Sequence, residues 1–174
     1  AGVRPIVAAD FSKRRRELAV ACGADIVVDP AASTPWQSWR EAAVYDASRA
    51  PALPPWIPGP AVRPAVVFEC VGVPGVLDQV MAAAPRGTRI VVVGVCMEPD
   101  TIHPLIGIGK ELNLQFVLGY TPEEFAATLG HIAEGAIPTA PLITGSVGLD
   151  GVAGAFTELG SPERHAKILV HPGR

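Results

Sequence analysis

Hydrophobic and polar positions follow two different periods, which alternate from one segment of the chain to the next. Short runs rich in β-branched residues predict strands at residues 3–9, 25–30, 65–70, 90–93 and 113–118. Apolar positions spaced three and four apart, bounded by capping signals and glycines, predict helices at residues 14–22, 34–48, 77–87 and 121–135. Beyond Pro138 the pattern predicts a strand at 142–144, a helix with its apolar face over 152–159, and a strand at 167–170. Residues 102–109 fit neither period clearly.

Strands that alternate with helices predict a doubly wound α/β fold with a parallel, Rossmann-like sheet. The run Ile90-Val91-Val92-Val93 supports this fold, because a parallel strand covered on both faces is apolar at every position. Six prolines at residues 50–64 exclude helix and sheet interior there. A strand follows them at once, so they form a loop inside the domain. In this fold the ligand crevice lies at the carboxyl ends of the strands.

The composition indicates a folded domain whose ligands are small molecules. The 174 residues are 49% hydrophobic and 18% charged, with a mean hydropathy of +0.32, which excludes intrinsic disorder. The net charge of −3 gives no basic surplus for nucleic acid or anionic lipid, and we expect no membrane span or secretory leader. The cysteines at 22, 70 and 96 fit reduced thiols better than a disulfide framework, so we expect a cytoplasmic protein.

Asp10 is the first candidate for cofactor binding. An acid at the end of a strand in a βαβ unit can accept hydrogen bonds from both adenosine ribose hydroxyls and repel a 2′-phosphate, which favours NAD over NADP. The alternative is that Asp10 caps the helix that begins near Ser12. The G-x-G-x-x-G fingerprint belongs about 20 residues before such an acid, so we expect it upstream of residue 1.

The run Lys13-Arg14-Arg15-Arg16 places four cations in the first turn of a helix, where the helix dipole disfavours them. An anionic neighbour would resolve this conflict, and Arg15 is the residue we would assign to a ligand. The alternative is a solvated charge run on the surface.

Glu69 lies in an apolar strand, and we favour a structural carboxylate tied to backbone N–H groups over a catalytic one. Gly72 and Gly94 lie at the ends of two strands, where glycine allows either close approach to a flat ring or a tight turn. The histidines and cysteines show no ligand spacing, so we expect no metal site in this chain and assign no catalytic residue.

Several short motifs follow one another along nearly the whole chain. They are Ile6-Val7-Ala8-Ala9-Asp10, Cys22-Gly23-Ala24-Asp25, Phe68-Glu69-Cys70-Val71-Gly72, Gly87-Thr88-Arg89-Ile90-Val91-Val92-Val93-Gly94, Lys110-Glu111-Leu112, Gly119-Tyr120-Thr121-Pro122-Glu123-Glu124-Phe125, Pro141-Leu142-Ile143-Thr144 and Lys167-Ile168-Leu169-Val170. Their order and spacing resemble the cofactor-binding half of the medium-chain, zinc-dependent alcohol dehydrogenases.

The resemblance implies a set of residues that bind NAD. Asp10 would hold the adenosine ribose, Phe11 would line the adenine and Arg15 would lie beside the ribose. Val71 and Gly72 would flank the cofactor from one strand end, and Val93, Gly94 and Val95 would lie along the nicotinamide. The backbone of Leu118, Gly119 and Tyr120 would hold the carboxamide.

The same resemblance implies a domain organisation and an assembly. Residues 1–138 would form a partial NAD-binding Rossmann domain, and residues 139–174 would return to pack on a catalytic domain. Residues 101–118 would form the edge of a homodimer or homotetramer.

The activity implied is that of an NAD-dependent oxidoreductase acting on a small alcohol or carbonyl compound. Zinc would belong to the parent protein, with its ligands outside this chain, and we expect the 174 residues alone to be inactive. Two alternatives remain open. One is a stand-alone Rossmann remnant that binds nucleotide weakly or serves association, and the other is a zinc-free relative of the quinone reductases.

Overall fold

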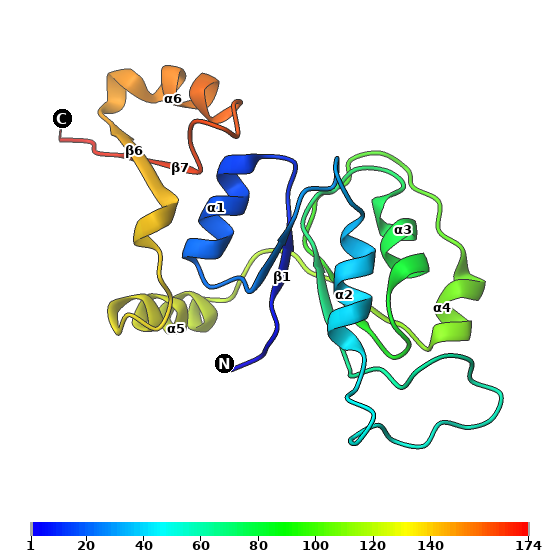
Figure 1. The fold of residues 1–174 in the computed structure, drawn as a ribbon. Coiled ribbons are helices and arrows are strands. Elements are labelled where there is room, and N and C mark those ends of the chain that lie inside the picture. Colours follow the sequence, from blue (N-terminus) through cyan, green and yellow to red (C-terminus); the bar gives the residue numbers. More distant parts are fainter. Residues whose placement is uncertain (1, 174) are drawn as a thin grey trace. The chain divides into compact units, whose positions relative to one another are not determined.

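A computed structural model describes residues 2–173. The chain divides into two compact units, one formed by Ala1–Pro35 with Tyr120–Arg174 and the other by Trp36–Gly119. Figure 1 shows the elements of both units along the chain.

The first unit holds two pairs of parallel strands. Its elements are β1 (Val7–Ala9), α1 (Lys13–Ala21), β2 (Ile26–Val28), α5 (Pro122–Ala133), η1 (Ala140–Leu142), β6 (Ile143–Val147), η2 (Leu149–Gly151), α6 (Val152–Leu159) and β7 (Lys167–Val170). Strand β1 pairs with β2, and β6 pairs with β7 through a register shift between Ile143 and Gly145. Along the chain, α1 lies between β1 and β2, and α6 lies between β6 and β7, as expected for parallel crossovers.

The second unit is built on a three-stranded parallel sheet in the order β3-β4-β5. Its elements are α2 (Pro35–Ala43, which begins at the boundary of the units), β3 (Val66–Glu69), α3 (Val76–Ala83), β4 (Arg89–Val92), α4 (Pro104–Lys110) and β5 (Asn113–Phe116). The central strand β4 contributes Ile90, which is 0% exposed, and Val92 to the core. These side chains pack against α3 residues Val80 and Met81, and Trp39 of α2 covers the same cluster.

The predicted α/β class with parallel strands is confirmed. All pairings between the named strands of residues 2–173 are parallel. Ile90, Val91 and Val92 of β4 are buried, as the apolar run predicts, whereas Val93, just beyond the strand, is exposed. The strands form three small sheets of two, three and two strands, where the sequence suggested one doubly wound sheet.

Two segments differ from the sequence prediction. Helix α2 ends at Ala43, before the expected residue 48, because Val44 forms an antiparallel bridge with Val62. The Gln37 side chain donates to Glu41 at 3.0 Å within α2. Residues 102–109, which fitted neither period, lie mostly in the short helix α4.

Helix α5 begins where its local signals predict. The Glu124 amide donates to the Thr121 hydroxyl at 3.2 Å, and the Glu124 carboxylate accepts from the Thr121 amide at 2.8 Å, which completes the capping box. Within residues 2–173, α5 and the other helices are all too short or too polar to cross a lipid bilayer.

Candidate functional site

Asp10 lies directly after β1, at the carboxyl end of the strand. Its Oδ1 accepts the Ser12 amide hydrogen at 2.8 Å, and Ser12 in turn caps α1 by accepting from the Arg15 amide at 3.1 Å. Its Oδ2 lies 3.7 Å from Nη1 of Arg15, and the side chain is about one-third exposed. The carboxylate therefore supports the start of α1 with one oxygen and keeps the other near a cation and solvent.

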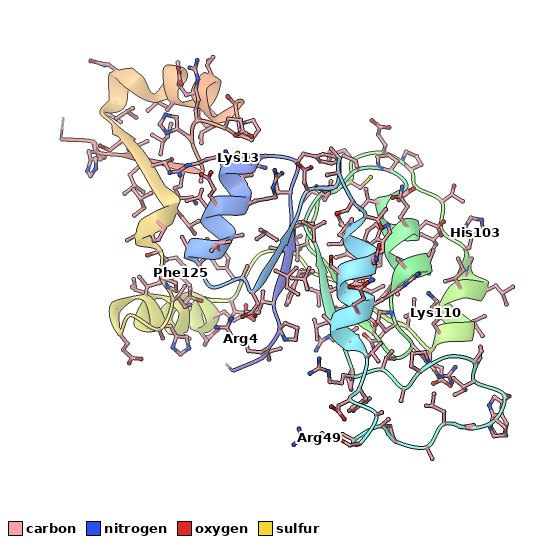
Figure 2. All side chains as sticks on the ribbon, in the orientation of Figure 1. Arg4, Lys13, Arg49, His103, Lys110 and Phe125 are labelled. Atoms are coloured by element: carbon pink, nitrogen blue, oxygen red, sulfur yellow. The ribbon has the colours of Figure 1, made fainter. Side chains whose placement is uncertain are left out.

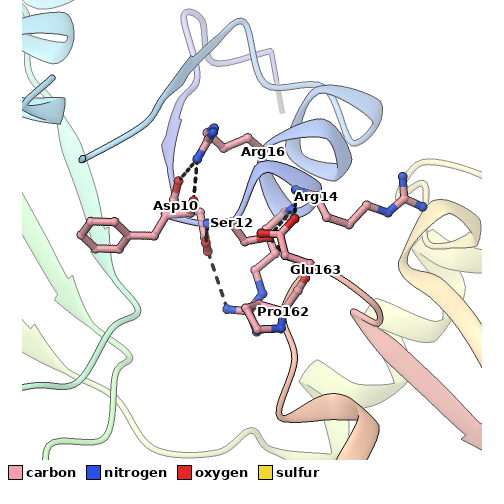
Figure 3. Close-up of polar contacts among 8 residues, drawn as sticks. Asp10, Ser12, Arg14, Arg16, Pro162 and Glu163 are labelled. Atoms are coloured by element: carbon pink, nitrogen blue, oxygen red, sulfur yellow. Dashed lines mark hydrogen bonds and ion pairs between the residues drawn. The ribbon is translucent and has the colours of Figure 1, made fainter. Parts of the chain in front are cut away.

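One of the acids at the basic first turn of α1 comes from far along the chain. The Arg14 amide donates to the Glu163 carboxylate at 3.3 Å, and the Ser12 hydroxyl donates to the Pro162 carbonyl at 3.2 Å (Figure 3). The sequence alone does not single out Glu163. No local signal could identify it, because its partner lies 149 positions away.

The four cations of this turn differ in how they are held. Arg16 is the most buried of the arginines that pair there, with 17% of its side chain exposed. It donates to the carbonyls of Asp10 at 2.7 Å and Phe11 at 2.8 Å, and it pairs with Asp29 at 2.9 Å. Arg16 thus fixes the backbone that carries Asp10, whereas Arg15 keeps its guanidinium half exposed beside that carboxylate.

In the second unit, Glu69 ends β3 as a buried structural carboxylate. It is 5% exposed, and its Oε1 accepts the amide hydrogens of Val71 at 2.6 Å and Gly72 at 2.9 Å. Its backbone carbonyl accepts from the amides of Val93 and Gly94. These bonds agree with the structural role that the sequence favoured, and they hold the ends of β3 and β4 together.

The two strand ends cross at Gly72 and Gly94. Gly72 has a φ of +69°, and a Cβ atom there would lie 2.6 Å from the Val95 amide nitrogen. A Cβ atom at Gly94 would overlap the Gly72 amide nitrogen and would lie 2.8 Å from Oε2 of Glu69. Both positions therefore require glycine, because a Cβ atom at either one would overlap backbone atoms of the other strand end.

Apolar side chains stand exposed around these strand ends. Val71 is 64% exposed, Val95 is 69% exposed and Leu118, beyond the end of β5, is 96% exposed. Val93 is also exposed, and Gly119 has a φ of +65° with open space where a Cβ would stand. Such a surface can receive a flat, largely apolar ring, as cofactor sites do.

The predicted cofactor residues divide between the two units. The first unit holds Asp10, Phe11, Arg15 and Tyr120. Asp10 contacts Arg15 there, and the centroids of the Tyr120 and Phe125 rings lie 5.7 Å apart. The second unit brings Gly72 against Gly94 and Val95. The second unit also holds the other predicted cofactor residues, Val71, Val93, Leu118 and Gly119.

The thiols and possible metal ligands of residues 2–173 remain separate. The cysteines at 22, 70 and 96 are free. Partial burial, and then the negative charge of Glu69, raise the pKa of the Cys70 thiol, so this thiol is a poor nucleophile near neutral pH. No three His, Cys, Asp or Glu side chains gather as a metal-binding group in this part of the chain.

The sequence model of the zinc-binding dehydrogenases matches residues 1–134. The chain is 30% identical to (R,R)-butanediol dehydrogenase of Bacillus subtilis over 173 residues, which cover 99% of this chain and 45% of that protein. The chain thus spans less than half the length of this relative.

Solved structures share the fold. A zinc-binding dehydrogenase from Sinorhizobium meliloti, bound to NADP, superposes with a TM-score of 0.73 at 27% identity, covering 99% of this chain and 46% of that one. A short chain alcohol dehydrogenase from Escherichia coli CFT073, complexed with NADH, superposes with a TM-score of 0.75 at 21% identity, covering 95% and 44%.

Proposed function

Because this chain belongs to the zinc-binding dehydrogenase family, we propose that it forms the cofactor-binding portion of an NAD-dependent alcohol dehydrogenase. The whole protein would oxidise a small alcohol to an aldehyde or ketone. The cofactor would supply the hydride acceptor, and this chain would bind and orient it. The observation that carries the choice of NAD is the carboxylate of Asp10 at the end of β1.

The geometry around Asp10 fits an adenosine ribose. Its Oδ1 accepts from the Ser12 amide, whereas its Oδ2 lies 3.7 Å from the half-exposed Arg15 guanidinium. Such an oxygen can accept a hydrogen bond from a ribose hydroxyl, and its negative charge repels a 2′-phosphate. Arg15 works in the opposite direction, since a guanidinium can bind that phosphate. Asp10 and Arg15 together therefore set the preference between NAD and NADP.

The second unit would hold the nicotinamide end. Val93, Gly94 and Val95 would lie along the ring, and Val71 and Gly72 would flank the cofactor. Leu118, Gly119 and Tyr120, the residue that follows them at the unit boundary, would hold the carboxamide through their backbone. The apolar exposure of these strand ends supports this assignment, because an isolated domain gains nothing from exposing large aliphatic side chains together.

Zinc does not fit the residues that the structure describes, since no three suitable side chains gather among them. No step through a metal is therefore assigned to this chain. We propose that the zinc ligands lie elsewhere in the whole protein, and that residues 139–174 pack on the part that carries them. The 174 residues alone would then not oxidise alcohols, and without the upstream glycine fingerprint they would bind nucleotide only weakly.

We further propose that the protein assembles with copies of itself through residues 101–118 and acts in the cytoplasm. In residues 2–173, β5 is paired only with β4, so its other edge is open to a neighbouring strand. Leu105, Ile108 and Phe116 are exposed on this stretch and support an apolar contact.

The variant Asp10→Asn in the intact enzyme tests the cofactor assignment. Asparagine retains an oxygen for the Ser12 amide but removes the charge. We expect NAD to bind roughly tenfold more weakly, from the loss of charge-assisted hydrogen bonds worth about 1.5 kcal/mol, and NADP to bind more tightly. The measurement is the fluorescence titration of NADH and NADPH. Asp150→Asn removes one charge from an exposed side chain of the same unit and should change neither affinity. An Asp10→Asn enzyme whose ratio of the two affinities stays within about twofold of the wild type would refute the assignment.

A further inference from the structure

The proline-rich loop between α2 and β3 borders an open cavity of about 550 Å³ within the second unit. Leu53, Ile57 and Pro58 of this loop line one side, and the chain segments that follow α3 and end α4 line the other. Figure 1 shows this loop extending past the ends of α2 and α4. The volume lies in the range that small-molecule sites occupy.

The cavity lies at the opposite end of the β3-β4-β5 sheet from Gly72 and Gly94. Its lining includes Val62, Gly87 and Lys110, which precede β3, β4 and β5 in the chain. Gly72 and Gly94 follow β3 and β4. A strand of four residues separates the two ends by roughly 13 Å, so a ligand in the cavity would not occupy the cofactor site.

One wall of the cavity carries positive charge without a matching acid. Arg40 donates through Nε to the Ala83 carbonyl at 3.1 Å. Lys110, labelled in Figure 2, donates to the carbonyls of Met81, Ala82 and Ala84. Among residues 2–173, neither cation lies within ion-pair distance of a carboxylate.

The remaining charges of the lining do not neutralise this wall. Arg86 and Glu111 pair with each other at 2.7 Å and leave no net charge. Partial burial lowers the pKa of the Lys110 ammonium, and the charge of Arg40 lowers it further. Two cations thus repel one another beside the cavity, and an anion between the loop and these side chains would relieve that repulsion.

The rest of the lining is largely apolar. It includes Val44, Leu53, Ile57 and Val62 together with prolines of the loop. A ligand that satisfies both the charged and the apolar parts of the lining needs a negative head and an apolar body. A single carboxylate suits the head better than a phosphate, for two reasons. Lys110 directs its donors to three carbonyls, which leaves the two terminal nitrogens of Arg40 as the available fork. The carbonyl ends of α3 and α4 also disfavour a second negative charge.

We propose that this cavity binds an organic monocarboxylate with an apolar body, such as a fatty or aryl acid. The Arg40 guanidinium receives the carboxylate, and Leu53 and Ile57 cover the apolar body. This site is independent of the proposed dehydrogenase function, since it uses none of the cofactor residues.

Sodium octanoate is the probe for the test, with calorimetry for affinity and amide chemical shifts for location, in the absence of any nicotinamide cofactor. We expect octanoate to shift the amides of residues that line the cavity. We expect 1-octanol, which lacks the charge, to bind about tenfold more weakly, and inorganic phosphate not to compete.

Two variants and one control decide the role of the cavity. Arg40→Gln should weaken octanoate binding about tenfold or more. Arg49→Gln removes the same charge from the segment after α2 (Figure 2), outside the cavity lining, and should leave the affinity unchanged. Leu53→Trp, at a partly exposed position, should block the cavity without disturbing the core, and it serves where Arg40→Gln fails to fold. The proposal is overturned if octanoate shifts no lining residue at about 10 mM, if the Arg40 and Arg49 variants bind alike, or if phosphate displaces octanoate.

Discussion

Alanine at position 72 should destabilise the protein much more than alanine at position 75. Both glycines have a left-handed backbone, with φ values of +69° and +82°. A Cβ atom at Gly75 would meet nothing within 4 Å, whereas one at Gly72 would lie 2.6 Å from the amide nitrogen of Val95 and 2.8 Å from the carbonyl carbon of Gly94. Comparing Gly72→Ala with Gly75→Ala therefore separates the stability lost to backbone conformation from the stability lost to steric overlap.

The magnitudes follow from these contacts. A left-handed conformation costs an alanine about 1 to 2 kcal/mol, which is the full expected effect of Gly75→Ala. Overpacking adds about 1 to 3 kcal/mol at Gly72, because the neighbours there are backbone atoms that cannot rotate away. We therefore expect Gly72→Ala to lower the free energy of unfolding by about 2 to 5 kcal/mol. Gly94→Ala, whose φ is not left-handed, should cost about 1 to 3 kcal/mol from overlap alone.

Urea unfolding followed by circular dichroism measures these differences through the midpoint of each transition. Equal destabilisation by Gly72→Ala and Gly75→Ala, within about 0.5 kcal/mol, would show that the strand ends do not cross in contact. The same variants report on the candidate site. Gly72→Ala should weaken NADH binding by the intact enzyme, whereas Gly75→Ala should not.

Two further predictions concern the first unit. Thr121→Ala removes the hydroxyl that accepts the Glu124 amide hydrogen at the start of α5, and urea unfolding should show a loss of about 1 kcal/mol, larger than that of Thr128→Ala inside the same helix. The hydrogen bond from Arg4 is the main reason that the pKa of Asp25 lies below its usual value of 3.8. The ionised Asp25 carboxylate therefore stabilises the fold fully above pH 3.8, and this stabilisation is lost as the pH falls through the lower pKa of the folded state. The melting temperature of Asp25→Asn should accordingly fall less than that of the wild type between about pH 5 and pH 3, and parallel curves for the two proteins would contradict this account.

The elements that sequence predicts best are those whose ends are fixed locally. Helix α5 carries its capping box and proline within four residues, and it begins where they indicate. Helix α2 also begins at a proline, Pro35, but its end depends on the bridge between Val44 and Val62, which the proline-rich loop brings together. No periodicity within residues 34–48 contains that information. The prediction therefore extended the helix too far.

The candidate site shows the same division. Glu69 could be assigned a structural role because an acid in an apolar strand must find donors nearby, and the amides of Val71 and Gly72 are its neighbours in sequence. The contact between Gly72 and Gly94 could not be derived, since either glycine alone fits a simple turn. Glu163 could not be predicted for a related reason. The basic first turn of α1 indicated that acids were needed nearby, but not that Glu163 would be one of them beside Asp10 and Asp29.

Asp10 was open to two interpretations, a ribose ligand or a support for α1, and the two oxygens of its carboxylate make these compatible. Oδ1 serves the Ser12 amide, and Oδ2 remains beside Arg15 at the edge of the strand. The two roles should then respond to different substitutions. Asp10→Asn keeps an acceptor for Ser12 and should preserve the melting temperature while changing the balance between NAD and NADP. Asp10→Ala removes both oxygens and should lower the melting temperature as well. If Asp10→Asn destabilised the protein as much as Asp10→Ala, the charge itself would be part of the fold, and its use for cofactor choice would lose its structural basis.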